Sequence, residues 1–493
     1  MLVNRVRYGS TSRVLAILLV LFAPASALAH QRLVRSEPAR DAQLSSVPRE
    51  LRLVFYEPME LAVTRVELMG PDGAPVALGG ALLVADSANV VVVPISGVLA
   101  AGVYAVRWRG AGADGHPVRG EFNFTIEPDA AGLAATAGEE PAGASTPPPA
   151  EHHPAASFPE RDGFGVESPG YVAVRWLTFL GLLGVIGAAA FRLLVLGLVR
   201  RQGAPEGLAL LGGAAVRAAR LGVWFALLLG VATAVRLGAQ SYAMHGAENA
   251  MAASEIGAML SRTVWGWGWM LQAGAALVAL VGFVLARRQV SAGWAFATLG
   301  VLALAFTPGL SGHAAATPGL AIPAVLADAA HMIGAGGWLG SLLVLLVAGI
   351  PAAHQLGEGR RGLGVAALVR AFSPTALLFA GLLIATGVFA SWLHLGSISN
   401  LWQSEYGRTL LLKLGIFALV FGTGAYNLRR VLPALGEDTG THRLRRSAGF
   451  ELAVGAVVLL VTAVLVATSP PADMDQMAGH DPAPVYPNPR STP

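Results

Sequence analysis

Hydrophobic and polar residues follow two different patterns along this chain. Between residues 30 and 127, short apolar runs alternate with polar residues and end at turn sequences, which is typical of strands that bury one face. Five runs fit this pattern: Leu51 to Phe55, Val63 to Met69, Asn89 to Pro94, Val103 to Trp108 and Glu121 to Ile126. Such runs within about 100 residues predict a small all-β sandwich.

From residue 171 onward the apolar residues form long continuous runs instead. A run of about 20 apolar residues can cross a bilayer as a helix. Eight runs reach this length, at approximately 171–199, 212–238, 263–286, 291–309, 320–350, 365–394, 409–431 and 447–468. The chain is therefore predicted to be of mixed class, an N-terminal all-β sandwich followed by an α-helical polytopic membrane bundle of eight spans.

Three segments fit neither pattern. Residues 1–29 have the arginines, the short apolar run and the small-x-small site at Ala27-Leu28-Ala29 of a secretory signal peptide, so cleavage would leave His30 as the N-terminus. Residues 128–170 are rich in Ala, Pro and Gly, and are expected to be a flexible linker to the membrane domain at 171–468. Residues 469–493 form a tail whose methionines and His480 are expected to be incidental.

Composition supports a membrane protein and narrows its chemistry. Hydrophobic residues make up 54% of the 493 and charged residues only 13%. Cysteine is absent, which excludes disulfides, thiolate metal sites and thiol catalysis. A metal must then be held by His, Met, Asp, Glu or a backbone amine. The chain also lacks GxSxG and HExxH motifs and a basic surface interleaved with aromatics, so neither an enzyme nor a nucleic-acid partner is expected.

Arginines orient the predicted spans in the lipid bilayer. Cytoplasmic loops of membrane proteins collect Lys and Arg. Nearly all the arginines that flank the predicted spans lie at the odd-numbered connections. They are Arg200, Arg201, Arg217, Arg220, Arg287, Arg288, Arg360, Arg361, Arg370, Arg429, Arg430, Arg443, Arg445 and Arg446. We therefore expect the odd-numbered connections in the cytoplasm, and the β domain and the C-terminus on the outer side of the membrane.

This orientation places several polar and aromatic residues on the outer half of the bundle. His245 is expected in the second connection, His313 and His394 at the outer ends of the fourth and sixth spans, and His331 inside the fifth span. The aromatic cluster Trp265, Trp267 and Trp269 is expected to form an interfacial belt at the outer boundary.

The fifth predicted span carries ionisable residues that need an explanation. Asp328 and His331 are three residues apart and so share one helical face, with Met332 beside them and Gly334 to Gly337 one turn further on. Each ionisable group at bilayer depth costs roughly 3 kcal/mol, and those that persist usually mark an ion path. We expect an ion path or relay here, with Asp328 as the acceptor that fixes the tautomer of His331. The alternative is a hydrogen bond that serves only helix packing.

A second set of candidate ligands lies in the β domain. An N-terminal His30 would offer its amine and Nδ1 as a chelate, and Asp114-Gly115-His116 could complete an N,N,N,O set. Tetragonal N/O ligation is the preference of Cu(II). His30, Asp114 and His116 are therefore predicted to hold Cu(II).

At these residues the sequence resembles a known family. The stretches HQRLVRSEPARDAQLSSVPRELRLVFYEPME from residue 30 and GADGHPVRGEFNFTI from residue 112 resemble the periplasmic copper-binding protein CopC. The membrane domain resembles the inner-membrane protein CopD in SGHAA at 311–315, DAAHMIGAGGWLGSL at 328–342, YGRTLLLKLGIF at 406–417, YNLRR at 426–430 and Glu451. The whole chain thus resembles a natural CopC-CopD fusion.

The resemblance implies a CopC-like sandwich of the immunoglobulin or cupredoxin kind, with Cu(II) ligands at His30, Asp114 and His116. It also implies a bacterial inner-membrane protein for copper uptake or tolerance, with its β domain and C-terminus in the periplasm, handling Cu(I) or Cu(II) and loaded by periplasmic copper donors. The copper path through the membrane domain is then expected to include His245, His313, Asp328, His331, Met332 and His394. A methionine-rich Cu(I) site, found in some CopC proteins, is not expected in a β domain with only Met59 and Met69.

Three functions remain open at this point. The first is delivery of copper from the β domain to the membrane path, which the buried Asp328, His331, Lys413 and Glu451 favour because an anchor needs none of them. The second is periplasmic sequestration of copper with the membrane domain as an anchor. The third is a haem-bearing redox protein that uses helix histidines as axial ligands.

Overall fold

A computed structural model describes residues 33–55, 58–84, 87–112, 115, 117–128, 168–317, 319–427, 429 and 438–468. The predicted signal peptide, nearly all of the linker and the C-terminal tail lie outside these residues, and so do His30, Asp114 and His116. The predictions made for them stay predictions.

Two sheets form the N-terminal domain, which confirms the predicted β class. One sheet has the strand order β1-β3-β7-β6 and the other the order β2-β9-β8-β4-β5. The strands are β1 (Leu33–Glu37), β2 (Gln43–Leu44), β3 (Glu50–Phe55), β4 (Arg65–Met69), β5 (Pro75–Val76), β6 (Leu82–Val84), β7 (Ser87–Pro94), β8 (Gly102–Ala111) and β9 (Pro117–Ile126). Each of the five predicted strands is present, although the start of the second is a short 3-10 helix, η1 (Leu61–Val63).

Alternation of side chains along the strands builds the core between the two sheets. On β3, Leu51, Leu53 and Phe55 are fully buried, as expected for every second residue of a strand that faces a core. The other sheet contributes aromatic rings, among them Tyr104 stacked on Phe124. The β domain therefore has a hydrophobic core of its own.

The rest of the described chain is helical and contains eight helices that are long and apolar enough to cross a membrane, as predicted. Several consist of successive segments. The helices are α3 (Pro169–Ala190), η2 (Phe191–Val195), α4 (Leu196–Gln202), α5 (Pro205–Asn249), α6 (Ala253–Arg262), α7 (Val264–Arg287), α8 (Gly293–Leu310), α9 (His313–Ala316), α10 (Ala321–Ala335), η3 (Gly336–Gly340), α11 (Ser341–Val344), η4 (Leu345–Gly349), α12 (Ile350–Ala353), α13 (Arg361–Leu395), α14 (Asn400–Gln403), α15 (Glu405–Tyr426) and α16 (Asp438–Leu465).

Small residues bring the fifth span into close contact with its neighbours. A Cβ on Gly336 would overlap Ile186 of α3, and one on Gly337 would overlap Phe379 of α13. Gly340 packs directly on the α3 backbone. This confirms that the glycine run allows close helix approach. The π-helical turn η3 lies within the same run.

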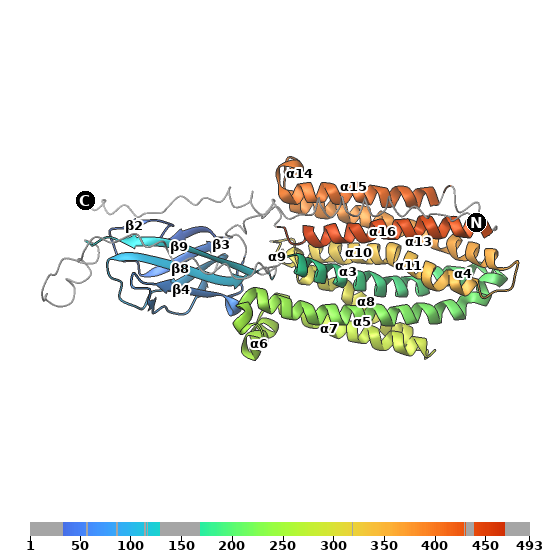
Figure 1. Ribbon diagram of the computed structural model, residues 1–493, viewed down its shortest axis with the longest axis horizontal. Helices are drawn as coiled ribbons and strands as arrows, with labels where there is room; N and C mark the ends of the chain where they lie inside the picture. The colour runs from blue at the N-terminus through green and yellow to red at the C-terminus, as the bar shows by residue number, and fades with distance from the viewer. Residues whose placement is uncertain are drawn as a thin grey trace, which may run out of the picture.

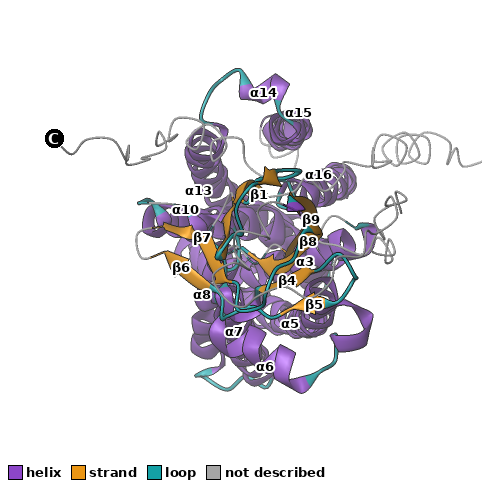
Figure 2. Ribbon diagram, turned by 90° about the vertical axis from the view of Figure 1, so that its left-hand side faces the viewer, coloured by secondary structure: helices purple, strands orange, loops and turns teal. Residues whose placement is uncertain are grey.

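The β domain lies at one end of the helical bundle, along the long axis of the molecule (Figure 1). Viewed along that axis, the sheets lie in front of the helix ends, with α6 on one side and α14 on the other (Figure 2). Helix α5 has 45 residues with a break at Gly246, and its continuous part from Pro205 to His245 is about 62 Å long at 1.5 Å per residue, about twice the thickness of a bilayer core. Its last turns therefore extend beyond the membrane depth and form part of the surface on which the β domain rests.

Candidate functional site

The β domain docks on the helices through the turn that follows β8. Gly112 and Gly115 are the described residues of this turn, and the Gly115 N–H donates to the Gly112 carbonyl at 2.9 Å. Gly115 has a φ of 79°, a conformation that favours glycine. Its sequence neighbours on either side are Asp114 and His116, two of the three predicted Cu(II) ligands.

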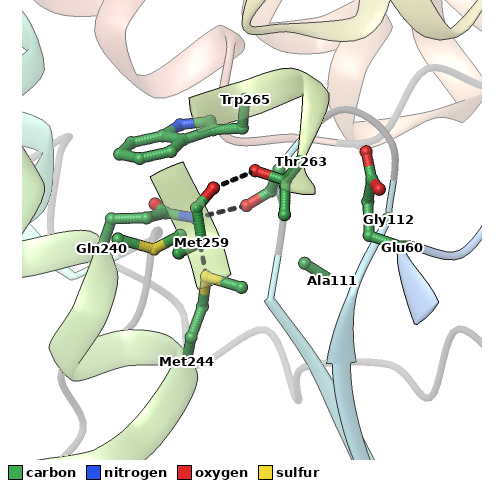
Figure 3. A pocket seen from close by; sticks show the side chains of 9 residues that line it. Glu60, Ala111, Gly112, Gln240, Met244, Met259, Thr263 and Trp265 are labelled. Carbon is green, nitrogen blue, oxygen red and sulfur yellow. Dashed lines mark hydrogen bonds between the residues drawn. The ribbon is translucent and has the colours of Figure 1, made fainter. Parts of the chain in front are cut away.

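Two side chains of the membrane domain receive this turn. The Gln240 Nε2 donates to the Gly115 carbonyl at 2.5 Å, while the Tyr171 hydroxyl donates to Gln240 Oε1 at 2.5 Å. Trp265 lies so close that a Cβ on Gly115 would overlap its indole ring. Gln240 and Trp265 are only 1% and 3% exposed, so the contact is a packed interface (Figure 3).

A second contact flanks the first. The Val264 N–H, at the start of α7, donates to Glu60 Oε1 at 3.0 Å. Burial raises the pKa of the Glu60 carboxyl above its ordinary value, and the hydrogen bond from Val264 partly offsets this. Val63 and Ala111 of the β domain share one apolar cluster with Met259 and Trp265. Hydrogen bonds and apolar packing together hold the two domains against each other.

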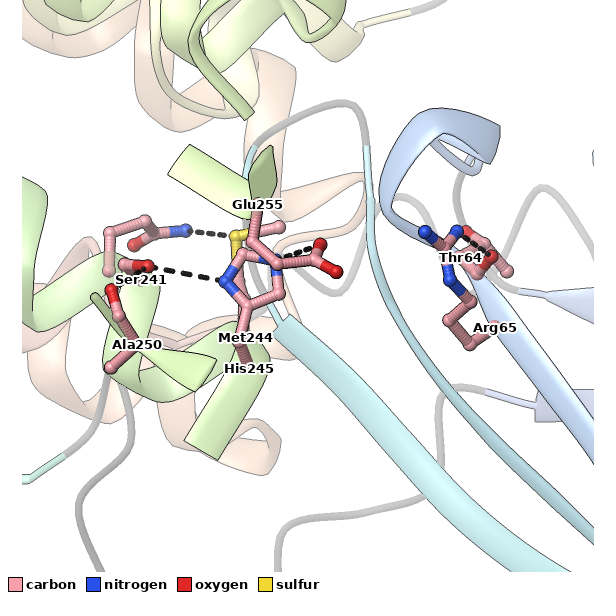
Figure 4. A network of polar contacts seen from close by, with 8 residues as sticks. Thr64, Arg65, Ser241, Met244, His245, Ala250 and Glu255 are labelled. Carbon is pink, nitrogen blue, oxygen red and sulfur yellow. Dashed lines mark hydrogen bonds and ion pairs between the residues drawn. The ribbon is translucent and has the colours of Figure 1, made fainter. Parts of the chain in front are cut away.

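His245 lies in the part of α5 that extends beyond the predicted second span, directly before the break at Gly246. The Ser241 hydroxyl donates to the Ala250 carbonyl at 2.7 Å and lies 3.2 Å from His245 Nδ1, so it accepts from Nδ1–H (Figure 4). The free lone pair of the neutral ring is then on Nε2. This atom is buried without a hydrogen bond, 3.5 Å from Glu255 Oε2.

Inside the bundle, Asp328 and His331 share one side of α10 as predicted. Lys413 of α15 lies close enough to interact electrostatically with both. His331 Nδ1 is 2.9 Å from Thr386 Oγ1 of α13. His331 Nδ1 therefore does not make the expected hydrogen bond to Asp328, because the Thr386 hydroxyl on α13 occupies that position.

Glu451 forms a separate polar group with different partners. It is 2% exposed and accepts from Trp338 Nε1 at 3.1 Å and from Asn427 Nδ2 at 3.2 Å. Trp338 belongs to η3 and its ring meets Phe417 and Phe421 of α15 edge-on. The fifth span thus contacts ionisable residues of α15 and α16 at two points along its length.

The remaining candidate residues of the membrane path have unconnected surroundings. His394 lies against Tyr406, their ring centroids 6.2 Å apart, and Met332 is buried in the bundle core. His313 begins the short helix α9. Across the described ranges, no group of three or more His, Cys, Asp or Glu side chains is arranged to hold a metal ion.

Sequence reasoning missed the residues that form the docking surface. Gln240 and Met244 lie on the extension of α5, Met259 on α6, and Tyr171 at the start of α3. Gln240, a polar residue next to a predicted span, could have indicated this docking surface, because a buried polar group needs a hydrogen-bond partner. Trp265 was assigned to a lipid-facing belt, whereas the structure buries it under the β domain; Trp267 is 58% exposed, in keeping with such a belt.

These features define a polytopic membrane protein that carries a docked extramembrane β-sandwich and buried polar residues in its helices. Family models match the β domain and the helices before and after the fifth span, whose residues from 325 on lie between two matches: "CopC domain" at residues 33–127, "Copper resistance protein D-like, N-terminal domain" at 166–324 and "Copper resistance protein D" at 366–465. The chain belongs to the copper-resistance family, as a CopC domain fused to a CopD membrane domain.

Three curated relatives agree with this assignment. Copper transport protein CutJ of Bacillus subtilis is 26% identical over 93% of this chain and 78% of its own length. Copper resistance protein D of Pseudomonas syringae pv. tomato is 28% identical over 62% of this chain and 98% of its own. Copper resistance protein C of Escherichia coli is 32% identical over 22% of this chain and 90% of its own. Their names describe copper resistance and transport.

Proposed function

We propose that this protein binds Cu(II) in the periplasm through its β domain and delivers copper across the inner membrane. In this proposal the signal peptide at 1–29 is removed, and His30, Asp114 and His116 hold the metal. The membrane domain then conducts copper past His331. Family membership supports the copper chemistry.

The observation that carries the proposal is the docking of the turn at Gly115 on Gln240 and Trp265. The two predicted ligands flank Gly115 in the sequence, and Gly115 is one of the points at which the helices hold the β domain. An independent metal store would not need its ligand turn to be held against a membrane domain. A donor that passes copper to that domain would.

The ionisable residues within the spans favour delivery over sequestration. Asp328, His331 and Lys413 are placed together inside spans, where each costs roughly 3 kcal/mol. His331 also has a hydroxyl partner, Thr386, that orients its ring, as is usual for a histidine that binds metal. A domain that served only as a membrane anchor would have no function to offset this free-energy cost. The haem alternative has no support among the relatives of the chain.

The test compares copper accumulation by membrane vesicles of known orientation that contain the full-length protein. His331→Ala should abolish accumulation and leave Cu(II) binding by the β domain unchanged, while Asp328→Asn should weaken accumulation less. His354→Ala is the matched control, because His354 is exposed beyond the end of the fifth span. Wild-type accumulation by His331→Ala at normal protein levels would leave sequestration as the better account.

A further inference from the structure

A small pocket lies between the two domains beside the docked turn. Its walls include Gly112 and Gly115 of the β domain and two methionines of the membrane domain, Met244 and Met259 (Figure 3). Met259 is fully buried, and Met244 packs in the same apolar cluster. Two thioether side chains thus line one pocket at the place where the domains meet.

We propose that Met244 and Met259 form a binding site for Cu(I) at this domain interface. This inference rests on the copper-delivery function proposed above and gives that function an intermediate position for the metal. The metal binds as Cu(I), and no change of its oxidation state is involved. Neither methionine belongs to the β domain, so the site is distinct from the predicted Cu(II) ligands.

The chemistry of the donors selects the ion. Thioether sulfur is a soft ligand that prefers Cu(I) over hard cations such as Na⁺ or Mg²⁺. The pocket is also too narrow for a free water molecule. A strongly hydrated ion, which keeps several of its waters, is therefore excluded.

Polar neighbours distinguish this pair from methionines that only fill a core. Gln240 Nε2 lies 3.6 Å from the Met244 sulfur, in addition to its bond to Gly115. This contact orients the thioether at the interface. The Glu60 carboxyl lines the same pocket and would offset the single positive charge of Cu(I). A pocket built only for packing needs neither an oriented sulfur nor an acidic wall.

The test uses Ag(I), which imitates Cu(I) without redox chemistry, on the full-length protein in detergent. Competition with a chromophoric chelator should show Ag(I) binding weakened more than about tenfold in the double variant Met244→Leu, Met259→Leu, since even changes around a metal ligand cost 10–100-fold. Leucine conserves the volume of methionine. Met251→Leu is the control and should bind as wild type, because Met251 is 80% exposed between α5 and α6.

X-ray absorption of the wild-type protein with one equivalent of Cu(I) gives a check that does not depend on folding of a variant. Sulfur scattering at the metal is expected, and a first shell of only nitrogen and oxygen would overturn the site. Unchanged Ag(I) affinity in the double variant would overturn it as well. Each single variant should show part of the loss if the double variant does not fold.

Vesicle assays on the same proteins separate this inference from the proposed function. If wild-type vesicles accumulate copper and the double variant binds Ag(I) normally, the site is wrong and delivery stands. If the double variant loses Ag(I) binding while wild-type vesicles accumulate no copper, the site stands and delivery is wrong.

Discussion

Substituting Gly115 by alanine should release the β domain from the membrane helices. Gly115 has a φ of 79°, and alanine in the left-handed region costs about 1–2 kcal/mol. The new Cβ would also overlap the Trp265 ring, and such overpacking typically costs about 1–3 kcal/mol. The backbone cost falls on the β domain whether or not it is docked, so only the overlap of about 1–3 kcal/mol changes the docked-to-undocked ratio. That ratio should fall roughly 5-fold to 140-fold, at tenfold per 1.4 kcal/mol.

Spin-label distances measure this directly, because the chain has no cysteine and accepts single labels cleanly. Labels at Val98 in the β domain and Ile398 in the connection before α14 are suitable, since both side chains are well exposed, at 98% and 75%. The wild-type protein should give one narrow distance distribution. Gly115→Ala should give a broad one.

Gly73→Ala provides the matched control. Gly73 has a φ of 75° but nothing within 4 Å of a built Cβ, so this variant carries the backbone cost without the overlap. It should destabilise the β domain slightly and keep the narrow distribution. If Gly115→Ala also kept the narrow distribution, the contact with Trp265 would not be what holds the domains together.

Three further predictions concern charge, metal and topology. Burial at the interface raises the pKa of Glu60, so docking takes up a proton. The docked population should therefore be largest near pH 4 and fall as the pH rises through the pKa of the docked Glu60. In the same spin-label assay, Glu60→Gln should flatten this pH dependence. An alanine inserted before His30 should weaken Cu(II) binding and change its EPR spectrum, whereas an unchanged spectrum would argue against the N-terminal chelate. Alkaline phosphatase fused near Arg360 should be inactive; activity there would reverse the predicted orientation.

The fold was largely predictable because its patterns are local. Alternation along Leu51 to Phe55 identifies a strand from five residues, and a long apolar run identifies a span without any knowledge of its neighbours. The shared face of Asp328 and His331 follows in the same way from helical geometry. Each of these predictions needs only residues close together in the sequence.

The docking surface could not be predicted, because its contacts join distant parts of the chain. Gln240 and Gly115 are 125 residues apart, and Glu60 and Val264 are 204 apart. The hydrophobic pattern along the sequence does not identify pairs of residues that are so far apart. The assignment of Trp265 to a lipid belt failed for this reason, since a tryptophan at a span end looks the same in sequence whether lipid or another domain covers it.

Polar residues of the membrane domain follow one another from Gln240 through Arg236 and Ser311 toward Asp328, and one hydrogen bond, from Arg236 to Ser311, joins two of them. Arg236 lies one helical turn from Gln240 on α5, and its Nη2 donates to Ser311 Oγ at 3.3 Å. Ser311 ends α8 two residues after Gly309, and a Cβ on Gly309 would lie 3.1 Å from Asp328 Oδ2.

A membrane anchor has no use for this polar succession, whereas a delivery route needs polar groups at every depth it crosses. The fixed positive charge of Arg236 near the outer end would repel a free cation, and the Asp328 carboxyl beyond it would attract one. Copper held at the interface lies beside the Glu60 carboxylate, which offsets part of that repulsion, whereas a hydrated ion from solution has no such neighbour. The order of charges therefore favours metal that arrives from the docked β domain over metal that enters directly from bulk solvent.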